Sequence, residues 1–187
     1  MNNAEVTVGT LQDSDIQEIS QLQHENLRTN LTPDQMQDGY LSIGFSDEQF
    51  RAFDDDLGVV VVRAEGRVVG YCCVSSATFN APFPILDQIV SGLSGYKIPG
   101  SEEKPTEVTT SIYGPACIEK DFRGQGVLQL LFEQAVTLSI AAGYAFCFSF
   151  VSVENRRSLK AHLKLPLEKV GTVSFNENEY RVIGCKL

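Results

Sequence analysis

The sequence predicts a single α/β domain. Strand-like runs rich in β-branched and aromatic residues alternate with stretches in which apolar residues recur at helical spacing. Because 43% of the 187 residues are apolar, the chain can bury a full core, and its Gly and Pro usage is ordinary. Residues 1–187 show no internal repeat, low-complexity tract or linker. One domain therefore accounts for the whole chain.

The first third of the chain is predicted to form one strand and three helices. The strand is an alternating run over residues 5–10, and apolar residues at helical spacing follow over 16–27. A second helix is expected at 32–36, where a threonine can cap the first turn and a proline occupies it. A third capped helix is expected over 46–53, and the acidic residues 54–56 are expected to form a solvated loop.

A hairpin and a long irregular insertion occupy the middle of the chain. Two β-branched runs over residues 58–76 flank a tight turn at 65–67. Prolines and glycines interrupt the insertion at 77–107, with one short helix expected at 86–93. A connection of this length is unusual in a compact domain. It is either a lid or binding loop, or an excursion without a role.

The last third is predicted to alternate strands and helices before a closing hairpin. A strand over 108–118 contains Gly114-Pro115. Because proline cannot donate to a ladder, we expect a bulge or a local loss of pairing there. A largely buried helix follows the next glycines and ends at Gly143. The remaining elements are a strand covered on both faces at 144–153, a helix over 155–165 and a closing hairpin over 168–187.

Charge is unevenly distributed along the chain. The net charge is −9, and residues 1–57 hold 12 acidic residues against two arginines, a net of −10. A strongly acidic segment disfavours nucleic acid as a partner. Its acids would suit a cationic or amine substrate if the segment lines a site, and otherwise they solvate exposed helices.

Composition also bears on compartment and cofactor chemistry. The five cysteines form no CxxC pair and lie in apolar runs, which indicates buried, reduced thiols in a cytoplasmic protein. With only His24 and His162 present, a histidine-based metal centre is not expected. Neither a run long enough to span a membrane nor a secretory signal is found, so no membrane association is expected.

Residues 118–136 carry the clearest sign of a ligand site. A strand-like run reaches Ile118, a charged turn follows, and Arg123-Gly-Gln-Gly precedes an apolar run of helical spacing. Glycines let backbone N–H groups come close to a ligand. The first N–H groups of a helix lack intrahelical partners and carry partial positive charge. This stretch therefore predicts an anion-binding turn suited to phosphate.

The turn and the element order together resemble a GNAT-type N-acetyltransferase over nearly the whole chain. That family binds the pyrophosphate of acetyl-CoA on an Arg/Gln-x-x-Gly-x-Gly/Ala turn, which residues 123–128 match except at the last position. A register two residues earlier, 121–126, restores the final glycine but places Asp121 in the basic position. We prefer the first register, because Arg123 then precedes the helix, and Leu128 is expected to point into the core.

A second motif strengthens the resemblance. The family follows its fifth strand with Asn-x-x-Ala/Ser-x-x-x-Tyr and then Gly-Phe, and here Asn155 and Ser158 stand at matching positions. In relatives the Asn binds the pantetheine or phosphate part of CoA, and the Tyr lies near the sulfur as general acid. Here His162 replaces that Tyr, and Pro166-Leu167 replaces Gly-Phe. The Asn, Ser and His positions are three and seven residues apart, so they share one helix face.

The resemblance implies the fold, the cosubstrate and the place of the site. It implies a mixed, mostly antiparallel sheet of about seven strands flanked by about four helices. The fourth and fifth strands are expected to splay apart at Gly114-Pro115, with the pantetheine of acetyl-CoA along the fourth. The residues expected to contact acetyl-CoA are Cys117, Ile118, Arg123, Gly124, Gln125, Gly126, Val127, Leu128, Asn155 and Ser158.

The leading hypothesis is an acetyl-CoA-dependent N-acetyltransferase that acts on the amine of a small molecule or a peptide. His162 is the candidate general acid, because an imidazole titrates near pH ~6.5 and can donate or accept a proton. The alternative is a histidine packed on a helix face. No general base is assigned among Tyr113, Ser149 and Glu119. Cys117 lies near the thioester, but it is interpreted as a buried strand thiol.

Two other functions stay open at this point. One is a catalytically silent GNAT-like module that binds CoA as a sensor or interaction partner, which the missing Tyr and the unassigned base favour. The other is an α/β binding protein whose turn holds a different anion or none. The sequence does not name the acceptor. The closing hairpin offers an edge that could pair across a homodimer.

Overall fold

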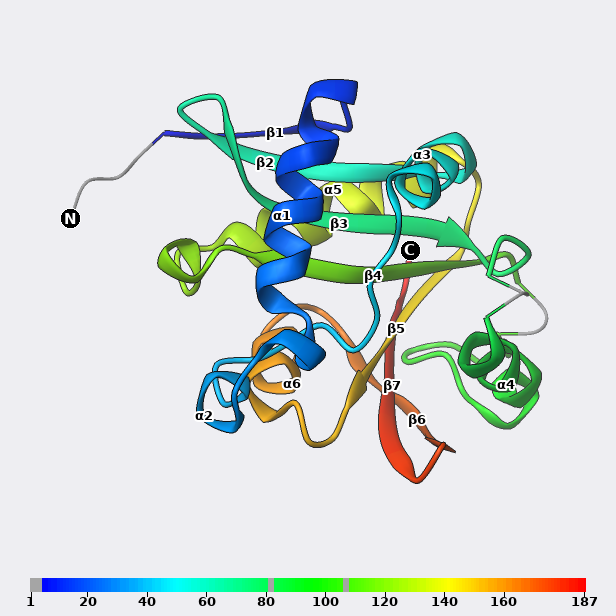
Figure 1. Cartoon of the computed structure of the whole chain (residues 1–187). Coiled ribbons are helices and arrows are strands. Elements are labelled where there is room, and N and C mark those ends of the chain that lie inside the picture. Colours follow the sequence, from blue (N-terminus) through cyan, green and yellow to red (C-terminus); the bar gives the residue numbers. More distant parts are fainter. Residues whose placement is uncertain (1–4, 81–82, 106–107) are drawn as a thin grey trace.

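A computed structural model describes residues 5–80, 83–105 and 108–187. Its centre is an open seven-stranded sheet with the strand order β1-β2-β3-β4-β5-β7-β6 (Figure 1). Neighbouring strands are antiparallel except β4 and β5, which are parallel. The predicted mixed, mostly antiparallel sheet is therefore confirmed. The strands are β1 (Val6–Thr10), β2 (Gly58–Ala64), β3 (Arg67–Ser76), β4 (Thr110–Ile118), β5 (Phe146–Ser152), β6 (Glu168–Phe175) and β7 (Asn178–Lys186).

Six α-helices lie in the described part of the chain, where the family resemblance implied about four. All six stand where the local sequence pattern predicted a helix, including the one inside the insertion. They are α1 (Ile16–Asn26), α2 (Pro33–Met36), α3 (Asp47–Asp56), α4 (Pro84–Gly92), α5 (Val127–Ala141) and α6 (Arg156–His162). Four short 3-10 turns accompany them: η1 (Asp13–Asp15), η2 (Arg28–Asn30), η3 (Leu93–Gly95) and η4 (Lys120–Phe122).

Side-chain caps start two helices of the acidic first third where the sequence predicted them. The Thr32 hydroxyl accepts the backbone N–H of Gln35 at the start of α2. The Ser46 hydroxyl does the same for Gln49 at the start of α3. In both helices the glutamine side chain accepts the backbone N–H of the cap residue in return. Each helix start thereby satisfies two backbone donors that would otherwise lack a partner.

The solvated loop predicted at residues 54–56 is wrong, because these acids form the last turn of α3. Their side chains explain the extension of the helix. Asp54 accepts the backbone N–H of Val59, and Asp56 accepts both the N–H and the hydroxyl of Ser76. These bonds tie the end of α3 to β2 and β3, a long-range contact that local acidity does not reveal.

Helices cover both faces of the sheet at its β1–β4 end. In Figure 1, α1 crosses the strands on the near side and α5 lies behind them. The β2 run explains how both faces are filled, because successive side chains of a strand point to opposite faces. Val60 and Val62 join the core under α5, whereas Val59 and Val61 join the core under α1 and α3. All four are fully buried.

The insertion packs against the other end of the sheet. Leu86 and Ile89 of α4 share a buried cluster with Phe148 of β5 and Val182 of β7. The Gln88 side chain also donates to the backbone carbonyl of Ser174 in β6. The insertion is therefore attached to the closing hairpin, whose strand β6 forms one edge of the sheet.

The parallel pair β4 and β5 separates partway along its length. The two strands pair only through three residues of each, from Thr110 beside Phe146 to Ile112 beside Phe148. Beyond that point they diverge (Figure 1). Against β3, strand β4 carries one extra residue at Gly114-Pro115, so the predicted bulge is confirmed. The separation leaves one side of β4 without a neighbouring strand.

Helix α6 follows β5 beside this opening. Asn155 caps it, and its side-chain oxygen accepts the backbone N–H of Ser158. The regular helix ends at His162, three residues before the predicted end at 165. The next residues continue as a turn, in which the backbone N–H of Leu165 reaches the carbonyl of His162.

Candidate active site

The glycine turn that begins α5 is exposed and open. Gly124 and Gly126 adopt left-handed backbone conformations, with φ of 77° and 87°. No side chain caps the helix, and apart from the adjoining residues no described atom lies within 4 Å of where a Cβ would stand on either glycine. The first backbone N–H groups of the 15-residue helix therefore face open space, where they can bind an anion. Gly126 stands at the N-cap and Val127 begins the helix.

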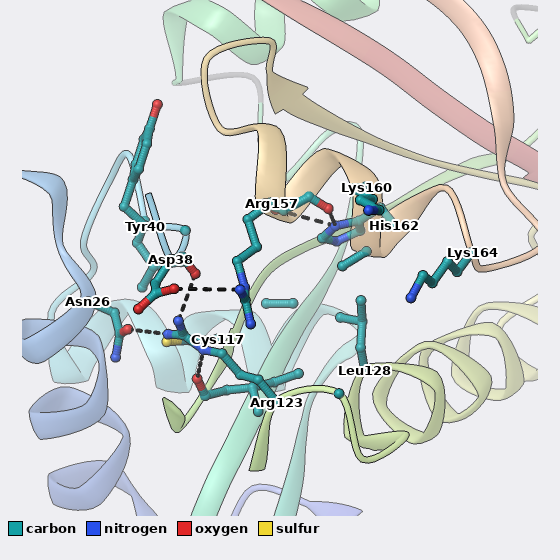
Figure 2. Close-up of a pocket in the computed structure, with 17 residues that line it drawn as sticks. Asn26, Asp38, Tyr40, Cys117, Arg123, Leu128, Arg157, Lys160, His162 and Lys164 are labelled. Carbon is teal, nitrogen blue, oxygen red and sulfur yellow. Dashed lines mark hydrogen bonds and ion pairs between the residues drawn. The ribbon is translucent and has the colours of Figure 1, made fainter. Parts of the chain in front are cut away.

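Arg123, the first residue of this turn, is held in place by hydrogen bonds to the protein. Its guanidinium donates to three protein oxygens, at 2.9 Å from the Ile118 carbonyl, 2.8 Å from the Asp38 carbonyl and 2.6 Å from the Asn26 side chain (Figure 2). Those bonds connect the end of β4, the end of α1 and the α2–α3 connection. Three of the five N–H donors of Arg123 are thereby used inside the protein.

The turn, α6 and residues 38–41 enclose a cavity of about 360 Å³, named here the turn cavity. Its described charged lining is mostly basic (Figure 2). The basic residues are Arg123, Arg157, Lys160 and Lys164, against the single acid Asp38. Leu128, predicted to point into the core, is half-buried, and it lines this cavity while packing against the core cluster under α5.

Asp38 is the focus of the ion pairs at this cavity. Its carboxylate lies 3.0 Å from the Lys120 ammonium and 3.5 Å from the Arg157 guanidinium. The hydrogen bond from Lys120 lowers the pKa of Asp38, and the charges of Lys120, Arg157 and Arg123 act in the same direction. Asp38 therefore stays ionised and pairs with Arg157, which lines the cavity, and with Lys120, which is not among its lining residues. Exposed pairs of this kind add little stability.

A second cavity of about 300 Å³ lies across the opening between β4 and β5, named here the aromatic cavity. Eight of its described lining residues are Phe or Tyr. The two cavities share five lining residues: Tyr40, Leu41, Ala116, Ser158 and His162. They therefore meet at the separation of β4 from β5, with α6 beside the junction.

His162 stands at this junction. It is 8% exposed, and its Nδ1 lies 2.8 Å from the Ser158 carbonyl oxygen. A carbonyl can only accept, so Nδ1 carries the proton and Nε2 keeps a free lone pair. Burial lowers the pKa of the imidazole, whereas the bond to Ser158 raises it to a smaller extent. His162 is therefore neutral at neutral pH.

Asn155, Ser158 and His162 line the aromatic cavity together, so the predicted shared helix face is confirmed. Asn155 is already engaged on both sides of its amide. Its oxygen caps α6, and its Nδ2 donates to the Tyr40 carbonyl at 2.8 Å. The side chain thereby holds the backbone at Tyr40, which lines both cavities. The Ser158 hydroxyl lies 3.4 Å from His162 Nδ1.

The backbone of β4 turns alternate residues toward the opening. The Glu119 N–H donates to Val69 of β3, and the Cys117 carbonyl likewise faces β3, close to Gly70. Because neighbouring residues of a strand point their polar groups to opposite sides, Ala116 and Ile118 present theirs to the opening. The Ile118 carbonyl is taken by Arg123. Among the residues expected to contact acetyl-CoA, Cys117 lines the turn cavity with its backbone turned away.

The remaining candidates for proton transfer lie in unlike settings. Glu119 pairs with Arg67 at 2.7 Å, on the far side of β4 from the opening. The Tyr113 hydroxyl is buried without a hydrogen-bond partner, and burial raises its pKa. Burial also raises the pKa of the Cys117 thiol to about 12, so it is protonated and a poor nucleophile. Ser149 is buried and lines the aromatic cavity beside Gly114.

Within residues 5–80, 83–105 and 108–187, no group of three His, Cys, Asp or Glu side chains is placed to hold a metal ion. None of the described helices combines the length and apolarity that a membrane crossing needs. All five cysteines are unpaired. The predicted burial is confirmed for four of them and is wrong for Cys185, which is partly exposed.

Comparison with known proteins places the chain in a family. The profile of the acetyltransferase (GNAT) family matches residues 16–165. The chain therefore belongs to the GNAT family of acetyltransferases, and the resemblance drawn from the two motifs is confirmed. No curated protein matches the sequence.

Solved structures share the fold. An N-acetyltransferase from Staphylococcus aureus Mu50 superimposes with a TM-score of 0.63 at 14% identity, covering 97% of this chain and 98% of that one. The yncA protein of Salmonella typhimurium, solved with its cofactor acetyl-CoA, gives 0.63 at 13% identity, covering 99% and 95%. The ribosomal-protein-S18-alanine N-acetyltransferase of Escherichia coli gives 0.61 at 8% identity, covering 97% and 94%. At these identities the likeness concerns the fold alone.

Proposed function

We propose that the protein transfers an acetyl group from acetyl-CoA to the amine of a small molecule or a peptide. The observation that carries this proposal is the meeting of two unlike cavities at the separation of β4 from β5, with His162 at the junction. A two-substrate transfer needs such a meeting point, because the thioester and the amine must be held in contact. Family membership supplies the reaction class.

The turn cavity suits acetyl-CoA. Backbone N–H groups of residues 124–128 would bind the pyrophosphate, and the basic rim would face the phosphates. Pantetheine would lie along β4, where Ala116 and Ile118 present backbone groups. In this proposal Arg123 and Asn155 act by fixing the walls, through the bonds that they make inside the protein.

In this proposal His162 both accepts a proton and donates one, which balances the protons of the transfer. The amine nitrogen loses a proton as the amide forms, and the departing thiolate gains one. Neutral His162 can accept the first proton on Nε2 and donate it to the sulfur, so it remains the candidate general acid. No separate base is then required, although a water could relay the proton.

The catalytically silent CoA sensor is not favoured. A sensor needs only the turn cavity, whereas here a second cavity opens on the same histidine. The chain's place in the GNAT family also argues against an unrelated anion-binding protein. Unpaired cysteines support a cytoplasmic location. Pairing of two copies through the edge strand β6 would give the homodimer, and the continuous sheet supports one domain over residues 1–187.

Two measurements test the proposed function. Acetyl-CoA at about 100 times its Kd is expected to raise the free energy of unfolding by about 2.7 kcal/mol in a thermal-shift titration. Thiol release from acetyl-CoA with a panel of primary amines then measures transfer. No stabilisation at saturating acetyl-CoA would end the proposal. Stabilisation without thiol release from any amine would favour the silent module instead.

A further inference from the structure

The wall of the aromatic cavity is built from parts of the chain that lie far apart in the sequence. The lining residues come from the segment before α3, from Phe53 of α3, from the insertion, from the separated strands β4 and β5, from α6 and its cap, and from the β6–β7 hairpin. The insertion was predicted to be either a lid or an excursion without a role. Phe83, Ile85 and Leu86 line the cavity, so the insertion forms part of its wall.

Aromatic rings dominate the lining. The chain has 11 Phe, six Tyr and no Trp, and eight of these 17 rings line this one cavity. The rings also pack on one another edge to face, with centroids 5.0 Å apart for Phe45 and Phe53 and 5.8 Å apart for Phe45 and Phe83. Across the cavity, Phe150 and Tyr180 pack with centroids 5.9 Å apart. A volume of about 300 Å³ is at the small end for a ligand site.

Charge is the second distinguishing feature. Among the described residues that line the aromatic cavity there is no Asp, Glu, Lys or Arg. Three of the five acids of nearby α3 are engaged elsewhere: Asp47 accepts from Ser20, and Asp54 and Asp56 accept from β2 and β3. None of the acids of the first third is among the described residues that line the aromatic cavity, so that segment supplies no carboxylate for a cationic substrate there. Its residues 40–45 line the cavity with uncharged side chains.

An ammonium ion entering such a site would lose its hydration without gaining a counter-ion. That loss disfavours the charged form, so an amine would bind here as the free base. The free base is also the form that attacks a thioester. The polar groups available to the amine nitrogen are neutral, and His162 lies at the junction with the turn cavity.

We infer that the acceptor is a small primary amine on an aromatic or branched apolar body, bound in its uncharged form. This inference rests on the proposed function, since it names the amine that the acetyl group is transferred to. Polyamines and amino acids are disfavoured, because the described lining offers no carboxylate for a second ammonium and no basic residue for a carboxylate. Peptides longer than the cavity are disfavoured by its volume.

The test compares acceptors of matched amine chemistry in the thiol-release assay. Phenethylamine is expected to give a kcat/KM at least about tenfold above putrescine, glycine and a glycine-led tripeptide. A higher value for any of these three would overturn the inference while leaving acetyl transfer established. Failure of acetyl-CoA to bind would instead overturn the proposed function.

A binding measurement decides the inference even if no amine is acetylated. Uncharged 2-phenylethanol is expected to bind the protein–CoA complex more tightly than phenethyltrimethylammonium, a permanent cation of similar shape, in calorimetry. Equal or tighter binding of the cation would mean that the rings act as a cation–π cage, which would overturn the inference. Failure of both probes to bind would overturn it as well.

A charge placed in the cavity gives a matched pair of variants. Ser42 is exposed and lines the aromatic cavity, whereas Ser91 is exposed on α4 and is not among the lining residues. Ser42→Glu is expected to shift the kcat/KM ratio by about threefold from phenethylamine toward putrescine, because the new carboxylate can pair with a second ammonium. Ser91→Glu is expected to leave the ratio unchanged. Equal ratios in both variants would contradict the placement of the acceptor.

Discussion

The turn cavity and the aromatic cavity differ in both charge and origin. The turn cavity is bordered by four basic residues and one acid, and most of its lining lies in or beside two short motifs. The described lining of the aromatic cavity is uncharged, and it comes from segments spread from residue 40 to residue 180. The comparison suggests that the donor site is fixed by contiguous sequence, whereas the acceptor site is assembled by the fold. His162 belongs to both.

Removing the shared histidine should give the largest effect. His162→Gln is expected to lower kcat by about 100-fold, since proton transfer by a positioned side chain contributes that much or more. The Kd of acetyl-CoA should stay within about threefold, because the proposed phosphate site is the glycine turn and not the imidazole ring. A thiol-release assay measures kcat, and calorimetry measures the Kd of acetyl-CoA.

The chain offers a matched control for this change. Its only other histidine, His24, is exposed on α1 and lines neither cavity. His24→Gln should retain the wild-type kcat. If both variants turned over at the wild-type rate, His162 would be a packed histidine and the junction would have no proton-transfer group.

The next largest effect should come from alanine substitutions at the glycines that flank the two ends of α5. Gly126 and Gly143 have φ of 87° and 83°, and neither has an atom within 4 Å of an added Cβ. Alanine at either position costs about 1–2 kcal/mol in a left-handed conformation. Only Gly126→Ala should also weaken the binding of acetyl-CoA, by about tenfold or more, because its methyl group would stand at the proposed phosphate site. Equal acetyl-CoA affinities for the two variants would remove the turn as the donor site.

Ionic strength should affect the two cavities differently. Raising NaCl from about 50 mM to about 500 mM screens the basic rim of the turn cavity, so KM for acetyl-CoA should rise about threefold. KM for an uncharged acceptor should change by less than about twofold. These values come from initial rates at a fixed free-base concentration of phenethylamine. A larger salt effect on the amine than on acetyl-CoA would reverse the comparison.

The smallest effect should appear in the pH dependence of stability. Burial lowers the folded-state pKa of His162 below its ordinary value near 6.5, so the unfolded chain binds more protons between the two values. The contribution of this group is therefore full above pH ~6.5 and is lost as the pH falls toward the folded pKa. Denaturant melts at several pH values give the free energy of unfolding. Over that window it should change less steeply with pH in His162→Gln than in His24→Gln. A steeper slope would contradict the assignment.

Local sequence was sufficient for most of the fold. Each helix and strand has its own pattern of caps, glycines or alternating apolar residues, and the Gly114-Pro115 interruption marked the separation of β4 from β5. The error at residues 54–56 has a tertiary cause. Asp54 and Asp56 bind backbone groups of β2 and β3, which no local pattern of acids can show.

The candidate site was predictable only in part, for a related reason. The motifs located the turn and the face shared by Asn155, Ser158 and His162. They did not show that Arg123 directs its guanidinium to protein oxygens, because those acceptors lie 5, 85 and 97 residues away. Nor could they show the aromatic cavity. Its rings lie in segments spread from residue 40 to residue 180 that are apolar for ordinary structural reasons, so no single segment carries a signal of ligand binding.

The structure of a ternary complex with CoA and 2-phenylethanol would test the central claim most directly. We expect the pyrophosphate on the backbone N–H groups of residues 124–128 and the sulfur beside His162. The phenyl ring should lie among Phe45, Phe83 and Phe150, on the other side of the separated strands. A phenyl ring bound outside the aromatic cavity, or a sulfur remote from His162, would contradict the account.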